Sequence, residues 1–195
     1  MFEIPTSIQI SEEEQLSIRC KGDYRMVLDC FAALNDTELT KEERVYCALI
    51  IFYEQFNSLE DLAHYPQLNE AVKQMYWFFN CGDDTGVGAN KHRKLIDWEG
   101  DSQLIASAVN KVANTEIRMA EYIHWWTFMG YYLAIGESPL ATIVGIRSKI
   151  MEGKKLEKYE TKFKNDNPQY FIWDNKSIED KEAEEAIMSL WNSGS

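Results

Sequence analysis

The sequence predicts a mainly α-helical fold with a small β-hairpin or strand pair at the N-terminus. Apolar residues recur at helical spacing through most of the 195 residues, and capping residues precede several of these segments. Short extended patterns occur only before Asp23. Hydrophobic residues make up 45% and charged residues 27% of the chain, which is typical of a globular domain rather than of a disordered or membrane protein.

Two short extended segments open the chain. Residues 7–10 (SIQI) and 15–19 (QLSIR) flank the acidic run SEEE. Extended segments joined by a short polar connection are typical of a hairpin or of two small strands. We therefore assign residues 1–22 to an N-terminal β element.

Capping signals predict four helical segments in the first half of the chain. Asp23 precedes a run with helical spacing and is a suitable N-cap. Thr40 and Glu43 form the pattern of a capping box, in which each residue binds the backbone at the other. Two further helical pieces are predicted to begin at Ser58 and near Pro66.

A glycine-rich segment separates this half from the next. Residues 81–101 hold four of the ten glycines and lack helical periodicity, which indicates a long loop. Beyond it, residues 102–112 and 116–135 are predicted to be helical, the second being apolar on nearly every side. Ser138 and Pro139 then start a short helix. We expect a single helical domain over residues 23–167, followed by an acidic C-terminal tail over residues 168–195.

The charge is strongly acidic and unevenly distributed. The chain has 32 acidic and 20 basic residues, a net charge of -12, and residues 1–146 alone carry -11. Residues 147–164 carry seven basic and three acidic side chains, whereas residues 174–195 carry two basic and six acidic ones. Binding to nucleic acid requires clustered Lys and Arg that neutralise phosphates, so we expect no nucleic-acid partner. The basic stretch is predicted to be a peripheral, solvated helix or a contact for an acidic protein partner.

No sequence motif in the chain predicts a catalytic, metal-binding or cofactor-binding site. The loop sequence GDDTGVGANK lacks the spacing of a phosphate-binding loop. His124 lies in an apolar segment, where a core histidine is a better interpretation than an acid or base. No nucleophile motif and no pair of ligands at metal-binding spacing is present. We therefore expect no catalytic, metal-binding or cofactor-binding residue, no cofactor, and no enzymatic activity.

The N-terminal sequence, the longest apolar stretch and the cysteine spacing predict the cellular compartment. The N-terminus has neither the basic region nor the apolar run of a signal peptide. The longest uncharged apolar stretch, residues 122–135, is shorter than the roughly 20 residues that a membrane-spanning helix needs. The four cysteines form no CxxC pair, which favours reduced thiols. We expect a cytoplasmic protein with no membrane partner.

Aromatic residues make up 13% of the chain and concentrate in two blocks, residues 76–79 and 122–132. Helical spacing in the second block places Trp125 and Tyr132 on one face and Trp126, Gly130 and Leu133 on another. One face can fill the core, and the other would need a second surface to cover it. Core packing is the first explanation, although Trp and Tyr also carry binding energy at interfaces.

Several segments together resemble a known family. These are residues 22–54, 71–82, 97–112, 123–135 and 143–150, whose most specific blocks read DYR, WFF-CG, HWW-F and IxGIRS-KI, with x and the hyphens marking intervening residues. In this order they are similar to the bacteriophage gp-fifteen family, from the tail modules of siphophages and prophages of Gram-positive bacteria.

The resemblance implies a tail-assembly chaperone in the cytoplasm of the bacterial host. Such a protein keeps the long tape-measure protein soluble, is expected to be absent from the mature virion, and has the tail-tube protein as a second candidate partner. Self-association is a further alternative. A virion component, such as a tail-completion or connector protein, and a small enzyme with an unrecognised site are the other functions left open. The candidate partner-binding residues are Trp125, Trp126, Phe128, Tyr131 and Tyr132.

Overall fold

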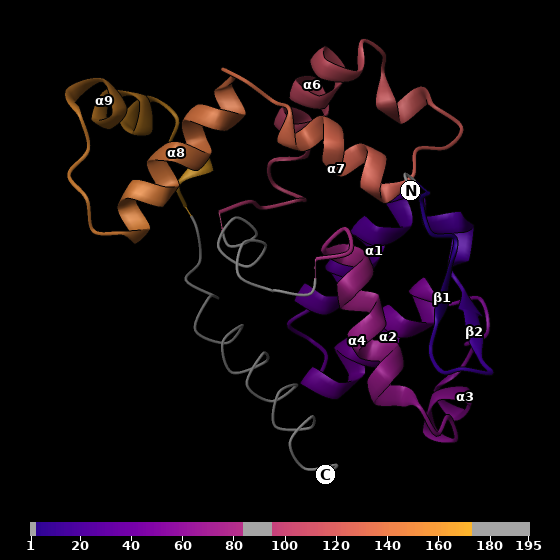
Figure 1. Cartoon of the computed structure of the whole chain (residues 1–195). Coiled ribbons are helices and arrows are strands. Elements are labelled where there is room, and N and C mark those ends of the chain that lie inside the picture. The colour runs from indigo at the N-terminus through magenta and orange to yellow at the C-terminus, as the bar shows by residue number, and fades with distance from the viewer. Residues whose placement is uncertain (1–2, 84–94, 173–195) are drawn as a thin grey trace. The chain divides into compact units, whose positions relative to one another are not determined.

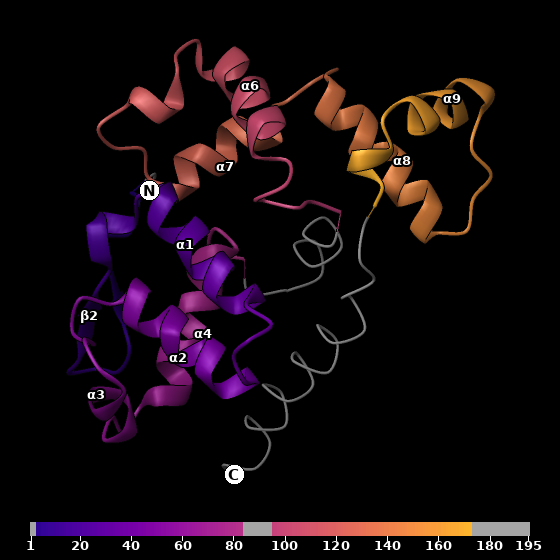
Figure 2. The same cartoon turned by 180° about the vertical axis from the view of Figure 1, so that it is seen from behind.

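The computed structural model describes residues 3–83 and 95–172, and these form two compact units. Among them, the first unit holds residues 3–83 and 121–129, and the second holds residues 95–120 and 130–172. The described residues form eight α-helices and one two-stranded antiparallel sheet, which confirms the predicted fold class (Figures 1 and 2).

The first unit opens with the predicted hairpin. Strand β1 (Ser7–Gln9) pairs with β2 (Gln15–Ser17), and Ile8 lies opposite Leu16. Both of these side chains are buried, because alternate residues of a strand point to one face. A short 3-10 helix, η1 (Arg19–Gly22), follows the hairpin and leads to the first α-helix.

Four helices follow, and local capping explains where three of them begin. The Asp23 carboxylate accepts a hydrogen bond from the Arg25 backbone N–H at 3.0 Å. The Thr40 and Ser58 hydroxyls cap the next two helices in the same manner, as predicted. Pro66 lies in the turn before the fourth helix. The bounds are α1 (Tyr24–Asn35), α2 (Lys41–Phe52), α3 (Leu59–Ala63) and α4 (Leu68–Phe79).

Aromatic rings form the core of this unit. Helices α1, α2 and α4 lie side by side in both views (Figures 1 and 2). Phe31 of α1 meets Phe79 of α4 and Trp125 edge-to-face, with ring centroids 5.1 and 5.5 Å apart. Phe52 of α2 contacts Phe78 and Phe79 in the same geometry. Edge-to-face pairs add to the stabilisation that apolar burial provides. Phe78 and Phe79, from the aromatic block 76–79, therefore pack in the core of this unit.

The second unit contains three further α-helices and part of a fourth. Ser138 caps α8 by accepting the Ala141 N–H at 3.1 Å, and Pro139 occupies the first turn, as predicted. Ile143 and Ile146 of α8 are fully buried, as is Val109 of α6. The bounds are α6 (Ser102–Ala113), η2 (Ile117–Met119), α7 (Trp125–Leu133), α8 (Pro139–Met151), α9 (Lys158–Asp166) and η3 (Pro168–Tyr170).

The prediction of one helix over residues 116–135 is wrong. The short η2 forms at Ile117–Met119, the backbone after it is extended, and α7 begins only at Trp125. The cause is a contact distant in sequence: the Asp23 carboxylate accepts the Ile123 N–H at 3.0 Å, and the Tyr24 N–H donates to the Ile123 carbonyl at 2.9 Å. These bonds hold the backbone extended before α7.

Three other predictions concern parts of the chain that lie largely outside the described residues. Most of the predicted loop 81–101 and of the predicted tail 168–195 lies outside them, and the proposed domain limits stay predictions. Toward the C-terminal end of the predicted loop, Leu95 and Ile96 are buried. Within the described part of the chain, no helix is long and apolar enough to cross a lipid bilayer.

Candidate functional site

Three sequence blocks that are distant along the chain meet in the first unit. They are the turn before α1, the C-terminal end of α4 and the start of α7. We call the set Gly22, Asp23, Phe78, Phe79, His124, Trp125 and Trp126 the aromatic junction. Its hydrogen bonds decide whether these residues are available for chemistry.

The end of α4 is closed by a two-bond C-cap. Cys81 has a left-handed backbone, with φ 57°, and its N–H donates to the Phe78 carbonyl at 3.0 Å. The Gly82 N–H donates to the Trp77 carbonyl at 3.0 Å. This is the Schellman arrangement, which binds carbonyls that the last turn of a helix leaves unpaired.

Two adjacent tryptophans complete this cap from α7. The Trp125 indole N–H donates to the Phe79 carbonyl at 3.0 Å, and the Trp126 indole N–H donates to the Phe78 carbonyl at 2.9 Å. Both groups therefore bind backbone oxygens at the end of α4. This pair anchors the start of α7 to the end of α4, which is a structural role.

His124 caps α7 and links it to the N-terminal segment. Its Nε2 lies 3.0 Å from the Pro5 carbonyl, which can only accept, so Nε2 carries the proton. Its Nδ1 accepts the Trp126 backbone N–H at 3.1 Å, as an Asn or Asp N-cap would. Burial lowers the pKa of His124, although the hydrogen bond to the Pro5 carbonyl and the nearby Asp23 carboxylate oppose this shift. The imidazole is held neutral as a cap.

The turn before α1 explains why glycine occurs there. Gly22 has φ +78°, and a Cβ at this position would lie 2.7 Å from the Phe78 ring and 3.0 Å from the His124 imidazole. A side chain would therefore collide with the junction and strain the backbone. The block beginning with Gly22 is thus fixed by contact with the other two blocks.

The second unit has a centre of its own, built on a buried ion pair. Arg147 of α8 binds the Asp101 carboxylate, and the two side chains are only 6% and 1% exposed. The same guanidinium donates to the Leu95 carbonyl at 2.9 Å and to the Tyr170 carbonyl at 2.7 Å. Because four protein oxygens surround Arg147, the guanidinium joins the start of α6, α8 and the segment after α9.

The comparisons with known proteins give one match. A family model described as bacteriophage Gp15 protein matches residues 3–170. The chain belongs to this family. No curated protein and no solved structure matches it.

Family membership makes this a phage protein. The family match also covers the aromatic junction of the first unit and the Arg147–Asp101 pair of the second. The matched range includes the DYR, WFF-CG and HWW-F blocks, which meet in the aromatic junction of this Gp15 chain. It also includes Arg147 from the IxGIRS-KI block. Each block that carried the resemblance thus supplies residues that hold a unit together. No pattern in the sequence indicated the partnership between Asp101, which precedes α6, and Arg147 of α8, because the two residues lie 46 positions apart.

The candidate partner-binding residues of this Gp15 chain differ in accessibility. Trp125 and Phe128 are each 1% exposed and belong to the core, where a partner cannot touch them while the unit is folded. Trp126 is half-buried against Trp77, with ring centroids 5.5 Å apart. Tyr131 is half-buried.

Tyr132 is the remaining candidate, and it packs within the second unit. Its ring lies against Trp98, with centroids 5.6 Å apart. Burial, with a smaller contribution from the Asp101 charge, raises the pKa of Tyr132 to about 12. The phenol is therefore neutral at physiological pH.

The accessible apolar face of α7 lies beside these aromatics. Leu133 is 75% exposed, and a Cβ placed at Gly130 would meet no atom within 4 Å among the described residues. Helical spacing already places both residues on one face with Trp126. The candidates predicted from the sequence are all aromatic and include neither Gly130 nor Leu133, although the helical spacing was a usable signal for both. Among the described residues, no group of His, Cys, Asp and Glu could hold a metal ion.

Proposed function

We propose that this chain is a non-enzymatic tail-assembly chaperone that binds the tape-measure protein of its phage, with the tail-tube protein as a second partner. Membership of the Gp15 family supports a phage role. The resemblance to tail-module proteins supports the more specific assignment. The binding is proposed to occur in the host cytoplasm, before the mature virion forms.

The chemistry of the buried polar groups supports a role in binding rather than in catalysis. The buried polar or charged residues among those described are Asp23, Asp101, His124, Arg147 and Glu160. Each binds a backbone or side-chain group of the chain itself. Their hydrogen-bonding capacity is used to hold helices and turns in place.

The uncovered face of α7 is the observation that carries the proposal. Leu133 offers an exposed apolar side chain, and Gly130, one turn earlier, leaves space above the helix backbone. An amphipathic helix binds by laying its apolar stripe against such a surface. A glycine at the contact allows the two backbones to approach closely.

This geometry suits a long helical partner. A tape-measure protein is a long helical chain with exposed apolar stripes, which aggregate when they are left uncovered. Contact with the α7 face would cover part of a stripe, while the net charge of -12 would keep the complexes apart through repulsion. The same charge would favour solubility without forming any specific contact.

The proposal is tested by co-expression with the tape-measure protein of the same phage. We expect the wild-type chain to keep the tape-measure protein soluble and to co-purify with it. Leu133→Asp places a charge on the proposed face and should abolish both effects. The matched control is Leu59→Asp, because Leu59 is also exposed, at 55%, but lies on α3.

The outcomes separate the alternatives. Equal loss of tape-measure solubility in both variants, or no loss in either, would show that the α7 face is not the binding surface. Mass spectrometry of purified phage particles addresses the second candidate function. A chaperone should be absent from the particles, whereas a connector or tail-completion protein should be present in a fixed number of copies.

A further inference from the structure

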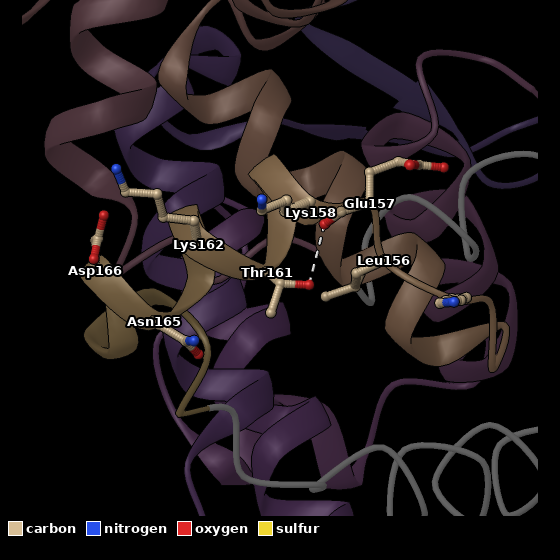
Figure 3. Close-up of a pocket in the computed structure, with 8 residues that line it drawn as sticks. Leu156, Glu157, Lys158, Thr161, Lys162, Asn165 and Asp166 are labelled. Atoms are coloured by element: carbon tan, nitrogen blue, oxygen red, sulfur yellow. Dashed lines mark hydrogen bonds between the residues drawn. The ribbon is translucent and has the colours of Figure 1, made fainter.

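The second unit carries an open hollow at its lysine-rich end. The hollow has a volume of about 650 Å³ and is formed by α9 and the segment just before it (Figure 3). The Thr161 hydroxyl donates to the Glu157 carbonyl at 3.1 Å, and this bond fixes the Thr161 side chain at the edge of the hollow. The lining residues are Lys155, Leu156, Glu157, Lys158, Thr161, Lys162, Asn165 and Asp166.

Three ammonium groups at this hollow have no carboxylate to bind among the described residues. Lys155, Lys158 and Lys162 are exposed, and none of them forms an ion pair within the described part of the chain. Lys158 and Lys162 are one helical turn apart, on the same side of α9. Glu157 and Asp166 also line the hollow, so its lining carries a small net positive charge.

Neighbouring acids are already engaged by other lysines. Glu160 is buried and accepts from Lys149 at 2.6 Å, and this bond lowers the pKa of Glu160. Glu152 binds Lys154 at 2.6 Å. The hollow is therefore a local cationic surface on an acidic protein, and it suits carboxylates from elsewhere.

The first unit presents carboxylates of a matching kind. The hairpin turn is closed by the Ile10 and Ser11 N–H groups, which donate to the Glu14 carbonyl at 2.9 and 3.2 Å. The Glu14 side chain accepts from Gln67 at 3.1 Å, which fixes the end of the turn. Glu12 and Glu13 lie between these anchors and are both exposed.

We infer that the lysine hollow of α9 binds the Glu12–Glu13 turn of a second copy of this chain. Two adjacent carboxylates on a short turn match two or three ammonium groups in charge and in scale. A long polyanion such as DNA would also approach the acidic body, which carries -11 over residues 1–146. At physiological salt, charges are screened beyond about 8 Å, so local complementarity outweighs the repulsion between distant parts of two copies.

Sedimentation of the full-length chain tests this contact. In about 150 mM NaCl we expect the average mass to rise above 22.7 kDa as protein concentration increases, and in about 500 mM NaCl we expect a monomer. K158E/K162E and E12K/E13K should each weaken association about tenfold or more, because charge reversal replaces attraction with like-charge repulsion. The quadruple variant E12K/E13K/K158E/K162E exchanges both charges and should restore it.

The controls distinguish this contact from a general effect of charge. K21E/K111E changes the net charge as much as K158E/K162E does, at exposed sites outside the hollow, and should leave association unchanged. Circular dichroism verifies that each variant is folded. A monomer at every salt and protein concentration, or failure of the quadruple variant to restore association, would overturn the inference.

Two further outcomes would assign the hollow to another occupant and reject this one. The first is association that persists in E12K/E13K but not in K158E/K162E, because a different acidic surface would then fill the hollow. The second is binding of a DNA oligonucleotide by the wild-type chain at the same salt concentration. Neither result bears on the α7 face, because Leu133→Asp tests that face separately.

Discussion

At the scale of single residues, His124 shows how a titratable group can serve as a cap. Its neutral ring accepts from the Trp126 N–H and donates to the Pro5 carbonyl. A second ring proton would remove the acceptor on Nδ1 and break the cap. The buried ring therefore makes the stability of the first unit depend on pH.

The direction of this dependence follows from the lowered pKa of His124. An unfolded histidine titrates near pH 6.5, whereas burial keeps the folded ring neutral to lower pH. The unfolded chain then binds more protons, so the free energy of unfolding should fall as pH drops below about 6.5. Denaturant titrations at pH 8, 7, 6 and 5.5 measure it.

The matched variant is His124→Asn, because Asn can accept the Trp126 N–H but does not titrate. Its free energy of unfolding should fall less between pH 7 and 5.5 than that of the wild type. The carboxylates of the chain contribute equally to both proteins. Parallel pH profiles for the two proteins would show that His124 has no part in the decline.

The buried pair of Arg147 and Asp101 makes a second prediction at this scale. Arg147→Met leaves the Asp101 carboxylate buried without its cation, a change that costs about 3–5 kcal/mol in other proteins. Because domains are stable by only about 5–15 kcal/mol, the second unit should be close to unfolding. Thermal unfolding followed by circular dichroism measures the loss.

The control for this variant is Arg118→Met. Arg118 binds Glu116 at 2.7 Å, but both side chains are substantially exposed, at 51% and 37%. Water screens such a pair, so its removal should change the unfolding temperature only slightly. Equal effects of the two substitutions would contradict the central role of Arg147.

At the scale of secondary structure elements, two glycines allow stability and binding to be separated. Gly130 lies within α7 and Gly145 within α8, and a Cβ at either position would meet no atom within 4 Å among the described residues. Alanine at each site should stabilise the helix by about 1 kcal/mol. Denaturant unfolding of the two variants measures this gain.

The two variants should differ in partner binding. If a helical partner approaches α7 at Gly130, the added methyl group should weaken its binding, whereas Gly145→Ala should leave binding unchanged. Pull-down of the tape-measure protein by each variant measures the difference. Unchanged binding by Gly130→Ala would argue against close approach at that position.

Helix starts that depend on neighbouring residues can be predicted from the sequence, whereas helix breaks that depend on distant contacts cannot. The starts at Asp23, Thr40, Ser58 and Ser138 were predictable, because a cap and the helix it closes are neighbours in sequence. The break before Trp125 was not, since it depends on hydrogen bonds to Asp23 and Tyr24, about a hundred positions away. Apolar composition alone could not reveal such bonds.

At the scale of the whole molecule, the sequence predicted the fold class and the family better than the surface. The aromatic blocks were recognised, but spacing could not show that Trp125 and Phe128 would be buried while Leu133 stayed exposed. That distinction depends on which helices cover α7. The uneven charge is visible in the sequence, whereas the pairing of Glu160 with Lys149 and the exposure of Lys158 and Lys162 required the structure.

The bonds from Trp125 and Trp126 to the end of α4 also provide built-in probes of local opening. An indole proton bonded to a carbonyl exchanges with deuterium only when that bond breaks, so two NMR signals would report the separation of α7 from α4. Three of the four tryptophans among the described residues, Trp77, Trp125 and Trp126, belong to the first unit. Fluorescence from these four would therefore mainly follow that unit.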